Sequence, residues 1–181
     1  MKMESEQSGS DDWRVPALDF SERMGRLAEH HGHPRMLGRV VGWLMVCEPP
    51  HQTTAQLARA LKASVSAVHT IVRGLLDKGL VDRITFPGER SAYYRIPEDA
   101  ATRMFRTGLP NVTAIRQLAE DGLKTFSWRS TEENQRLREL YEFHAFFERE
   151  MPRLLERWEE ERQRRSREVP GSDEGRGNNS G

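Results

Sequence analysis

Hydroxyl, imidazole and guanidinium groups gather on one side of the segment 64–78. If this segment is a helix, Val68, Val72 and Leu75 share its buried face, and small polar side chains occupy the opposite one. Such groups hydrogen-bond to base edges, and small residues let a helix approach the bases of the major groove closely. The predicted DNA contacts of this recognition helix are Ser64, Ser66, Ala67, His69, Thr70 and Arg73.

A further cation, Arg90, lies in a turn between two β-prone runs, residues 80–86 and 92–96. The turn has the sequence Pro-Gly-Glu-Arg, which predicts a β-hairpin with a charged tip. An exposed arginine on a narrow hairpin can enter the minor groove or bind phosphate, and Glu89 is placed to orient its guanidinium. We expect residues 81–96 to form the wing of a DNA-binding unit; the alternative is an ordinary surface ion pair.

The elements that carry these groups follow the helix-turn-helix pattern. Thr53 or Thr54 is expected to cap a short helix that runs through Leu61, because a hydroxyl there can accept an unpaired backbone hydrogen bond. Ser64 is expected to cap the next helix, and Gly79 to end it. Two short helices joined by a tight turn, followed by a hairpin, predict a winged helix-turn-helix.

Charge is distributed unevenly along the chain, although the 181 residues contain 28 Lys and Arg against 28 Asp and Glu. Residues 33–95 carry nine basic and four acidic side chains, a net charge of +5. A basic segment flanked by acidic ones can bind phosphate without making the whole chain basic. Double-stranded DNA is therefore the expected partner.

Other classes of protein find little support. Cys47 is the single cysteine, so no internal disulfide and no multi-thiolate zinc site is expected, and His30, His31 and His33 lack nearby ligands that would close a metal site. No phosphate-binding glycine loop or nucleophile motif is present, so we expect neither an enzyme nor a cofactor. No apolar run is long enough for a membrane span and no secretory signal is recognisable, which predicts a cytoplasmic protein without a membrane partner.

Two segments flank the basic unit and are expected to be helical. Residues 16–30 have apolar side chains at helical spacing, and residues 35–47 form a strongly apolar helix. Within the latter, Gly38 and Gly42 favour close approach of another helix, whereas Arg35 and Arg39 are as compatible with phosphate contact as with surface ion pairs.

The C-terminal half is predicted to consist of helices that mediate dimerisation. We expect two helices in residues 98–128, separated at 108–110 by a glycine and a proline. Further on, apolar residues alternate at spacings of three and four, as in a heptad repeat, and Pro152 is expected to kink this helix or start a new one. The predicted dimer interface comprises Leu137, Leu140, His144, Phe147, Met151, Leu154 and Trp158.

Aromatic residues suggest where a small effector could bind. Aromatic walls suit apolar or quaternary-ammonium ligands, although aromatic residues at helical spacing more often belong to a core. The candidates for an effector site are Trp43, Phe105, Trp128 and Tyr141, with Phe126 and Phe146 as further aromatic residues.

A family resemblance rests on residues 33–45, the segment Ala-Gln-Leu-Ala-Arg-Ala-Leu at 55–61, Gly-Leu-Val at 79–81, and the Pro-Gly-Glu-Arg turn with Tyr93 and Tyr94. These elements resemble the GbsR branch of the MarR-type winged-helix transcriptional regulators. The Pro-Arg-x-x-Gly-Arg element that begins at Pro34 and the turn are fairly specific. The resemblance implies a cytoplasmic homodimer whose terminal helices form the dimer core and whose two winged units bind a palindromic operator. Val65 and Ser66 depart from the basic residue and glycine usual in the branch.

We therefore predict a mainly α-helical chain with a small β-hairpin wing and dimerisation helices at both ends. Its function is expected to be sequence-specific regulation of transcription, and the alternative is a winged-helix module that binds proteins and not DNA. The expected divisions are a disordered start (1–12), an N-terminal dimerisation helix (13–32), a winged helix-turn-helix (33–97), a helical dimerisation region (98–168) and a disordered tail (169–181).

Overall fold

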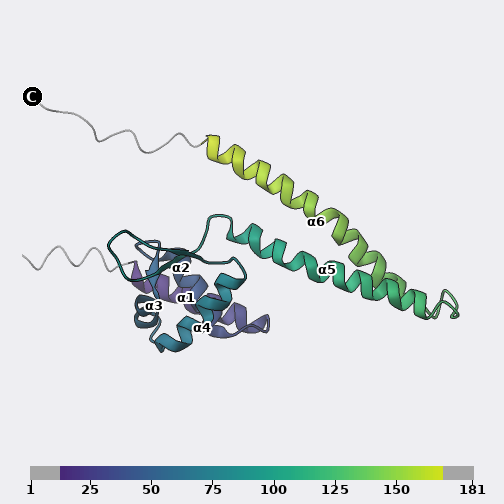
Figure 1. Cartoon of the computed structure of the whole chain (residues 1–181), viewed down its shortest axis with the longest axis horizontal. Coiled ribbons are helices and arrows are strands. Elements are labelled where there is room, and N and C mark those ends of the chain that lie inside the picture. Colours follow the sequence, from purple (N-terminus) through teal and green to yellow (C-terminus); the bar gives the residue numbers. More distant parts are fainter. Residues whose placement is uncertain (1–12, 169–181) are drawn as a thin grey trace, which may run out of the picture. The chain divides into compact units, whose positions relative to one another are not determined.

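The computed structural model describes residues 13–168, and the termini predicted to be disordered lie outside them. The chain divides into two compact units, Met1–Thr107 and Gly108–Gly181. The fold is mainly helical with one small sheet, as predicted (Figure 1). No helix among the described residues is long and apolar enough to cross a membrane. The elements, in chain order, are α1 (Arg14–His30), α2 (Arg35–Val46), β1 (Gln52–Thr53), α3 (Thr54–Ala60), α4 (Val65–Asp77), β2 (Asp82–Ile84), β3 (Tyr93–Arg95), α5 (Ala100–Thr125) and α6 (Gln135–Glu168).

Close packing of α1 on α2 depends on glycines. A Cβ atom placed on Gly38 would lie 2.2 Å from the carbonyl oxygen of Met24, and one on Gly42 would lie 2.9 Å from the Cα of Ser21. The hydroxyl of Ser21 is fully buried in this contact and donates a 2.7 Å hydrogen bond to the carbonyl of Arg39. The predicted packing role of these two glycines is confirmed.

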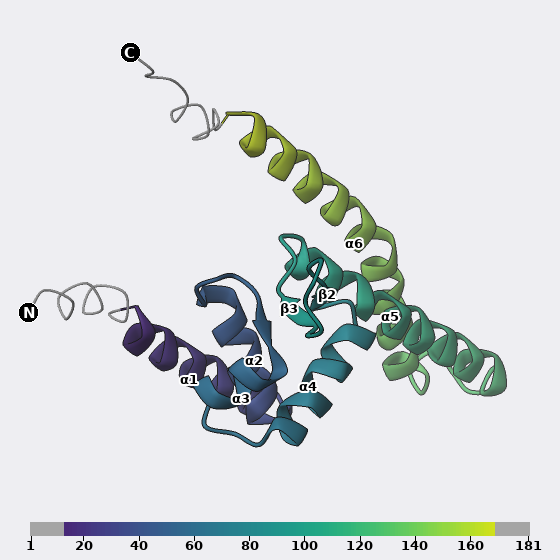
Figure 2. The same ribbon diagram turned by 60° about the vertical axis from the view of Figure 1, so that its left-hand side comes forward.

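The helix-turn-helix forms as its capping residues predict. Thr53 accepts a hydrogen bond from the backbone N–H of Gln56, whose side chain accepts one from the backbone of Thr53 in return. Ser64 caps α4 by accepting from the N–H of Ala67. Figure 2 shows α1 to α4 together with the hairpin strands β2 and β3. The core beneath them includes Val40, Leu57, Val68, Val72 and Leu75.

The wing hairpin, β2 and β3, belongs to a three-stranded antiparallel sheet in the order β1-β3-β2, in which β3 is the central strand. In the predicted hairpin, Arg83 pairs with Tyr94 and Ile84 with Tyr93. β1 was not predicted from the sequence. Its two residues pair with the other edge of β3, so Gln52 lies opposite Tyr94 and joins the wing to the start of α3.

The prediction of two helices in residues 98–128 is wrong, because α5 is continuous and contains Pro110. Proline removes one hydrogen-bond donor from a helix at a cost of about 3 kcal/mol, which anchoring on both sides can offset. In the first unit, Arg103 near the start of α5 forms ion pairs of 2.9 Å with Asp82 and Asp99. In the second unit, the following turns pack against α6. The Gly-Leu-Pro sequence therefore marks the boundary between units without ending the helix.

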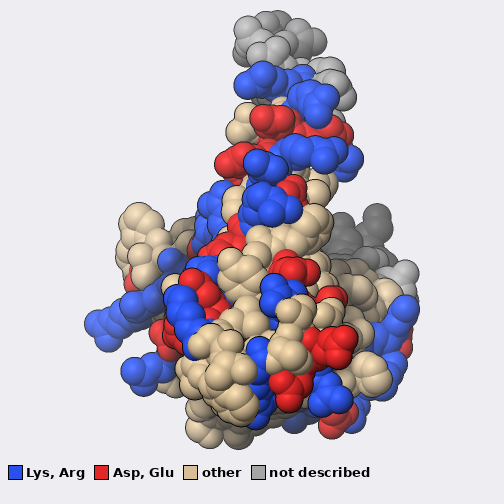
Figure 3. All heavy atoms as spheres, turned by 90° about the vertical axis from the view of Figure 1, so that its right-hand side faces the viewer, with Lys and Arg blue, Asp and Glu red and all other residues tan. Residues whose placement is uncertain are grey.

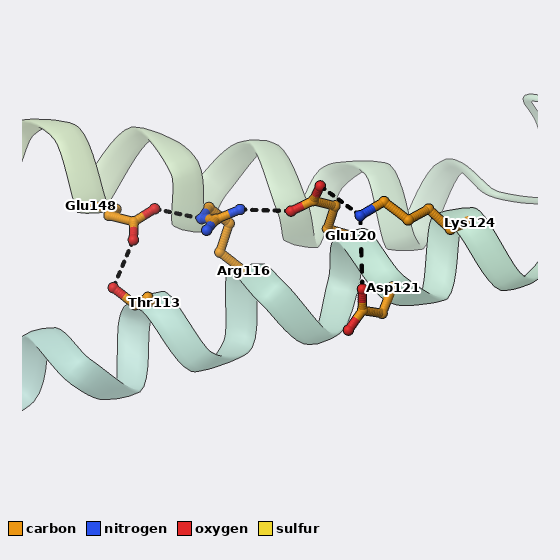
Figure 4. A network of polar contacts seen from close by, with 6 residues as sticks. All are labelled: Thr113, Arg116, Glu120, Asp121, Lys124 and Glu148. Carbon is orange, nitrogen blue, oxygen red and sulfur yellow. Dashed lines mark hydrogen bonds and ion pairs between the residues drawn. The ribbon is translucent and has the colours of Figure 1, made fainter.

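Polar side chains fix how α5 and α6 pair in the second unit (Figure 4). Glu148 of α6 accepts a 2.7 Å hydrogen bond from Thr113 and forms an ion pair with Arg116. These contacts lower the pKa of Glu148, the hydrogen bond from Thr113 being the largest cause. The network extends along α5 through Glu120 to Lys124, with ion pairs of 2.9 Å. Arg116 thus sets the register of the two antiparallel helices.

α6 also runs past a proline without interruption. Pro152 lies inside the helix, so the alternative of a new helix starting there is wrong, and Figure 1 shows the ribbon of α6 bending along its length. Within one chain, Leu154 is 56% exposed and Trp158 43%, and Leu140, Phe143 and Phe146 are exposed as well. Basic and acidic side chains mingle on the part of α6 next to the grey C-terminal residues (Figure 3).

Candidate nucleic-acid interface

The outer face of α4 presents the residues predicted to contact DNA. Val68, Val72 and Leu75 are buried beneath the helix, as predicted. The remaining side chains of its first turns leave the approach to the backbone open because they are small. The exposed residues of this face are Ser64, Val65, Ser66, Ala67, His69, Thr70 and Arg73.

Hydroxyl groups on this face already make hydrogen bonds within α4. The Ser64 hydroxyl caps the helix and lies 3.2 Å from the Ser66 hydroxyl, and Thr70 donates to the carbonyl of Ser66. Arg73 forms no ion pair with any described residue. The guanidinium of Arg73 is therefore the free cation of this face, and the hydroxyls also order its N-terminal end.

At the wing tip, the structure differs from the sequence interpretation. Glu89 was expected to orient Arg90, but its carboxylate accepts a hydrogen bond from the hydroxyl of Tyr93. This bond raises the pKa of Tyr93. Arg90 is exposed and has no ion-pair partner in the part of the chain that the structure describes. The contact of Tyr93 with Glu89 was not predicted, because two residues four positions apart are brought together only when the hairpin folds.

For Arg35 and Arg39 the geometry favours the ion-pair alternative. Both bind Glu22 of α1, at 2.8 Å and 2.6 Å. The hydrogen bond from Arg35 is the main cause that lowers the pKa of Glu22. The Arg39 side chain is only 18% exposed and also donates to the carbonyl of Leu61 at the end of α3. Arg39 thus connects α1, α2 and α3.

The four predicted effector residues are divided between the units. Trp43 and Phe105 belong to the first unit and Trp128 and Tyr141 to the second. Trp43 is only 4% exposed, and its ring centroid lies 5.5 Å from that of Trp13. Both rings line a cavity of about 390 Å³ within the first unit. Its other walls include Leu18, Gln52, Gln56 and Arg59.

The environments of Cys47, His30 and His31 are typical of residues with a structural role. Burial raises the pKa of the Cys47 thiol to about 11, so this group is not a thiolate at neutral pH. His31 bonds to the carbonyl of Leu27, and its ring lies edge-on to that of His30. In residues 13–168, no three or more His, Cys, Asp or Glu side chains are grouped in a way that would hold a metal ion.

A helix with small and polar residues on its exposed face, a wing with an exposed arginine at its tip and the helices packed with them define a winged helix-turn-helix unit. The model of the MmpR5-like MarR family transcriptional regulators matches residues 99–161. The HTH-type transcriptional regulator MmpR5 of Mycobacterium tuberculosis is 31% identical over 141 residues, which cover 78% of this chain and 86% of that protein. The chain therefore belongs to the MarR family of transcriptional regulators, among its MmpR5-like members.

One solved structure has a closely similar fold, and a second matches less well. A crystal structure described as that of a transcriptional regulator has a TM-score of 0.70 and 30% identity, and the match covers 80% of this chain and 99% of that one. MepR, a regulator of the Staphylococcus aureus multidrug efflux pump MepA, has a TM-score of 0.38 and 19% identity over 71% of this chain and 90% of its own.

Proposed function

We propose that this regulator binds a palindromic DNA operator as a homodimer, through the recognition helix α4 and the wing. The observation that carries the proposal is the exposed face of α4, which lies opposite the buried side chains Val68, Val72 and Leu75. It is supported by the wing-tip residue Arg90, which is exposed and forms no ion pair with a described residue. Residues 33–95 supply the positive charge that such a contact needs. The contacting side chains in this proposal are Ser64, Ser66, Ala67, His69, Thr70, Arg73 and Arg90.

Replacing either arginine by alanine is expected to weaken operator binding without unfolding the protein, because both side chains are exposed. If Arg73 reads a base, Arg73→Ala costs about 1–3 kcal/mol and relaxes sequence preference. If Arg90 binds phosphate, Arg90→Ala weakens binding to all DNA sequences alike. It also reduces the slope of log affinity against log salt concentration by about 1. Fluorescence anisotropy with operator and scrambled duplexes measures both effects, and unchanged affinity in both variants would contradict the proposed interface.

The dimer is proposed to form through the apolar side chains that α6 exposes. One stripe of α6 contains Leu140, Phe143, Phe147, Leu154 and Trp158. Of these side chains, Phe143, Leu154 and Trp158 are each more than 40% exposed in a single chain. Large apolar patches on a single chain mark interfaces. Leu137 belongs to the edge of the predicted seam that packs on Gly122 of α5, so the seam serves both the helix pair and the proposed dimer.

The cavity beside Trp43 is the proposed effector site within the first unit. Its volume lies in the range of small-molecule sites, and two indole rings form part of its wall. The Trp43 indole N–H is buried and has no acceptor among the described residues. The cavity wall contains the cations Arg14 and Arg59 and one carboxylate, Glu48, and this net positive charge disfavours a quaternary ammonium ion. A flat apolar molecule with one hydrogen-bond acceptor fits this cavity better.

Quinoline, which has such an acceptor, is expected to change tryptophan emission and operator affinity together, whereas benzyltrimethylammonium is not. A ligand shifts the DNA-binding state only if it binds the two states unequally. Trp43→Phe should abolish both responses, and Trp128→Phe should retain them because Trp128 is 75% exposed in the other unit. Release of DNA by quinoline from the Trp43→Phe variant would place the pocket elsewhere.

Two finer assignments complete the proposal. Membership of the GbsR branch rests on the Pro-Arg-x-x-Gly-Arg element and the Pro-Gly-Glu-Arg turn, and a cytoplasmic location accords with action on DNA. The alternative function, a winged-helix module that binds proteins, is favoured by the zero net charge. Steep weakening of binding with salt separates the two, because DNA binding releases counterions and a protein interface need not.

A further inference from the structure

Three aromatic rings pack against each other at the turn end of the wing hairpin. Their centroids are 5.0 Å apart for His51 and Phe86, 5.3 Å for His51 and Tyr93, and 5.2 Å for Phe86 and Tyr93. His51 precedes β1, Phe86 follows β2 and Tyr93 begins β3. Each ring therefore comes from a different segment of the sheet, and the orientation of the Tyr93 ring is fixed from two sides.

The hydroxyl of Tyr93 connects this aromatic cluster to the wing turn. It donates a hydrogen bond to the carboxylate of Glu89, and the backbone N–H of Glu89 donates to the carbonyl of Phe86 over 3.1 Å. Gly88 makes this turn possible with a φ of +83°. Glu89 is thus held by both its side chain and its backbone, while the next residue, Arg90, has no ion pair with a described residue.

We propose that Tyr93 is a positioning residue of the wing: it binds the Glu89 carboxylate and so prevents Glu89 from pairing with Arg90. A carboxylate next to an arginine in the sequence competes with DNA phosphate for the guanidinium, because both form charge-assisted hydrogen bonds with it. Held on Tyr93, it leaves Arg90 available for a DNA phosphate or the minor groove. This inference rests on the proposed function, because it concerns how the wing presents its cation to DNA.

Removing the Tyr93 hydroxyl tests the inference. Tyr93→Phe keeps the ring in its aromatic cluster and frees Glu89, so affinity for a duplex from upstream of the encoding gene should fall about three- to tenfold, the range of one hydrogen bond. Adding Glu89→Gln should restore binding to that of the Glu89→Gln single variant, because a neutral amide does not compete for Arg90. In an Arg90→Ala background, Tyr93→Phe should have no further effect.

Tyr94→Phe is the matched control. Tyr94 is the next residue of β3 and belongs to the core, and its hydroxyl makes no hydrogen bond with the described residues, so this variant should bind like the wild type. Thermal melts confirm that each variant folds. Wild-type affinity in Tyr93→Phe, an equal loss in the Arg90→Ala background, or no recovery with Glu89→Gln would each overturn the positioning role. A wild-type chain that binds no DNA would overturn the proposed function and this inference with it.

Discussion

A chain that carries both Leu154→Glu and Trp158→Glu is expected to be monomeric and to bind operator DNA about 100-fold or more weakly. Both side chains are exposed in a single chain, and they lie one helical turn apart on the stripe proposed as the dimer interface. Two new carboxylates there would be buried without partners in a dimer, which opposes association. A dimer gains its operator affinity from two linked winged units, and such linkage contributes about 10²–10⁴-fold.

Sedimentation at micromolar concentration and anisotropy titration measure the two effects. Gln163→Glu is the matched control, because it places a new carboxylate on the opposite, exposed side of the same helix. It should leave both mass and affinity unchanged. A wild-type protein that sediments as a monomer, or a double variant that remains dimeric, would show that the stripe is not the interface.

Gly38→Ala is expected to destabilise the first unit more than any other single methyl addition at a described glycine. The new Cβ would lie 2.2 Å from a backbone oxygen of α1 and 2.7 Å from the Cβ of Ala28, so one helix must move. Overpacking of this kind typically costs about 1–3 kcal/mol and sometimes more. Each kcal/mol lowers the melting temperature by about 2–4 °C in a chain of this length. Thermal unfolding followed by circular dichroism measures the loss.

Gly74→Ala provides the comparison. Gly74 lies inside α4, where a Cβ would meet no atom within 4 Å. Alanine forms helix better than glycine by about 0.5–1 kcal/mol, so this variant should melt slightly higher than the wild type. Gly42→Ala should fall between the two, since its nearest neighbour is at 2.9 Å. A Gly38→Ala protein as stable as the wild type would contradict the described contact of α1 with α2.

Sequence reasoning located the helix-turn-helix because its signals are local. Thr53 and Ser64 accept backbone hydrogen bonds three residues ahead, and Val68, Val72 and Leu75 follow the helical period. Gly79 ends its helix with a φ of +66°. These features depend on residues within one or two turns, so they can be predicted before the tertiary structure is known.

The errors concern features that depend on distant residues. Pro110 would end an isolated helix, but α5 is anchored by Asp82 before it and Glu148 after it. β1 is only two residues long and exists because β3 offers an edge for pairing. The carboxylate of Glu89 was assigned to its sequence neighbour, whereas the folded hairpin brings the hydroxyl of Tyr93 to it. Each of these contacts acquires its meaning only when the chain is folded.

Binding of the full chain to the DNA upstream of its own gene, titrated at several salt concentrations, tests most directly whether α4 and the wing form a DNA interface. We predict a specific complex that a scrambled competitor duplex does not displace, and whose affinity falls steeply with salt. In a plot of log affinity against log salt concentration, the fall should be about 0.9 for each phosphate neutralised. Arg73→Ala should relax the preference for the specific duplex. Binding that does not weaken with salt, or an equal affinity for both duplexes in the wild type, would contradict sequence-specific DNA binding by this regulator.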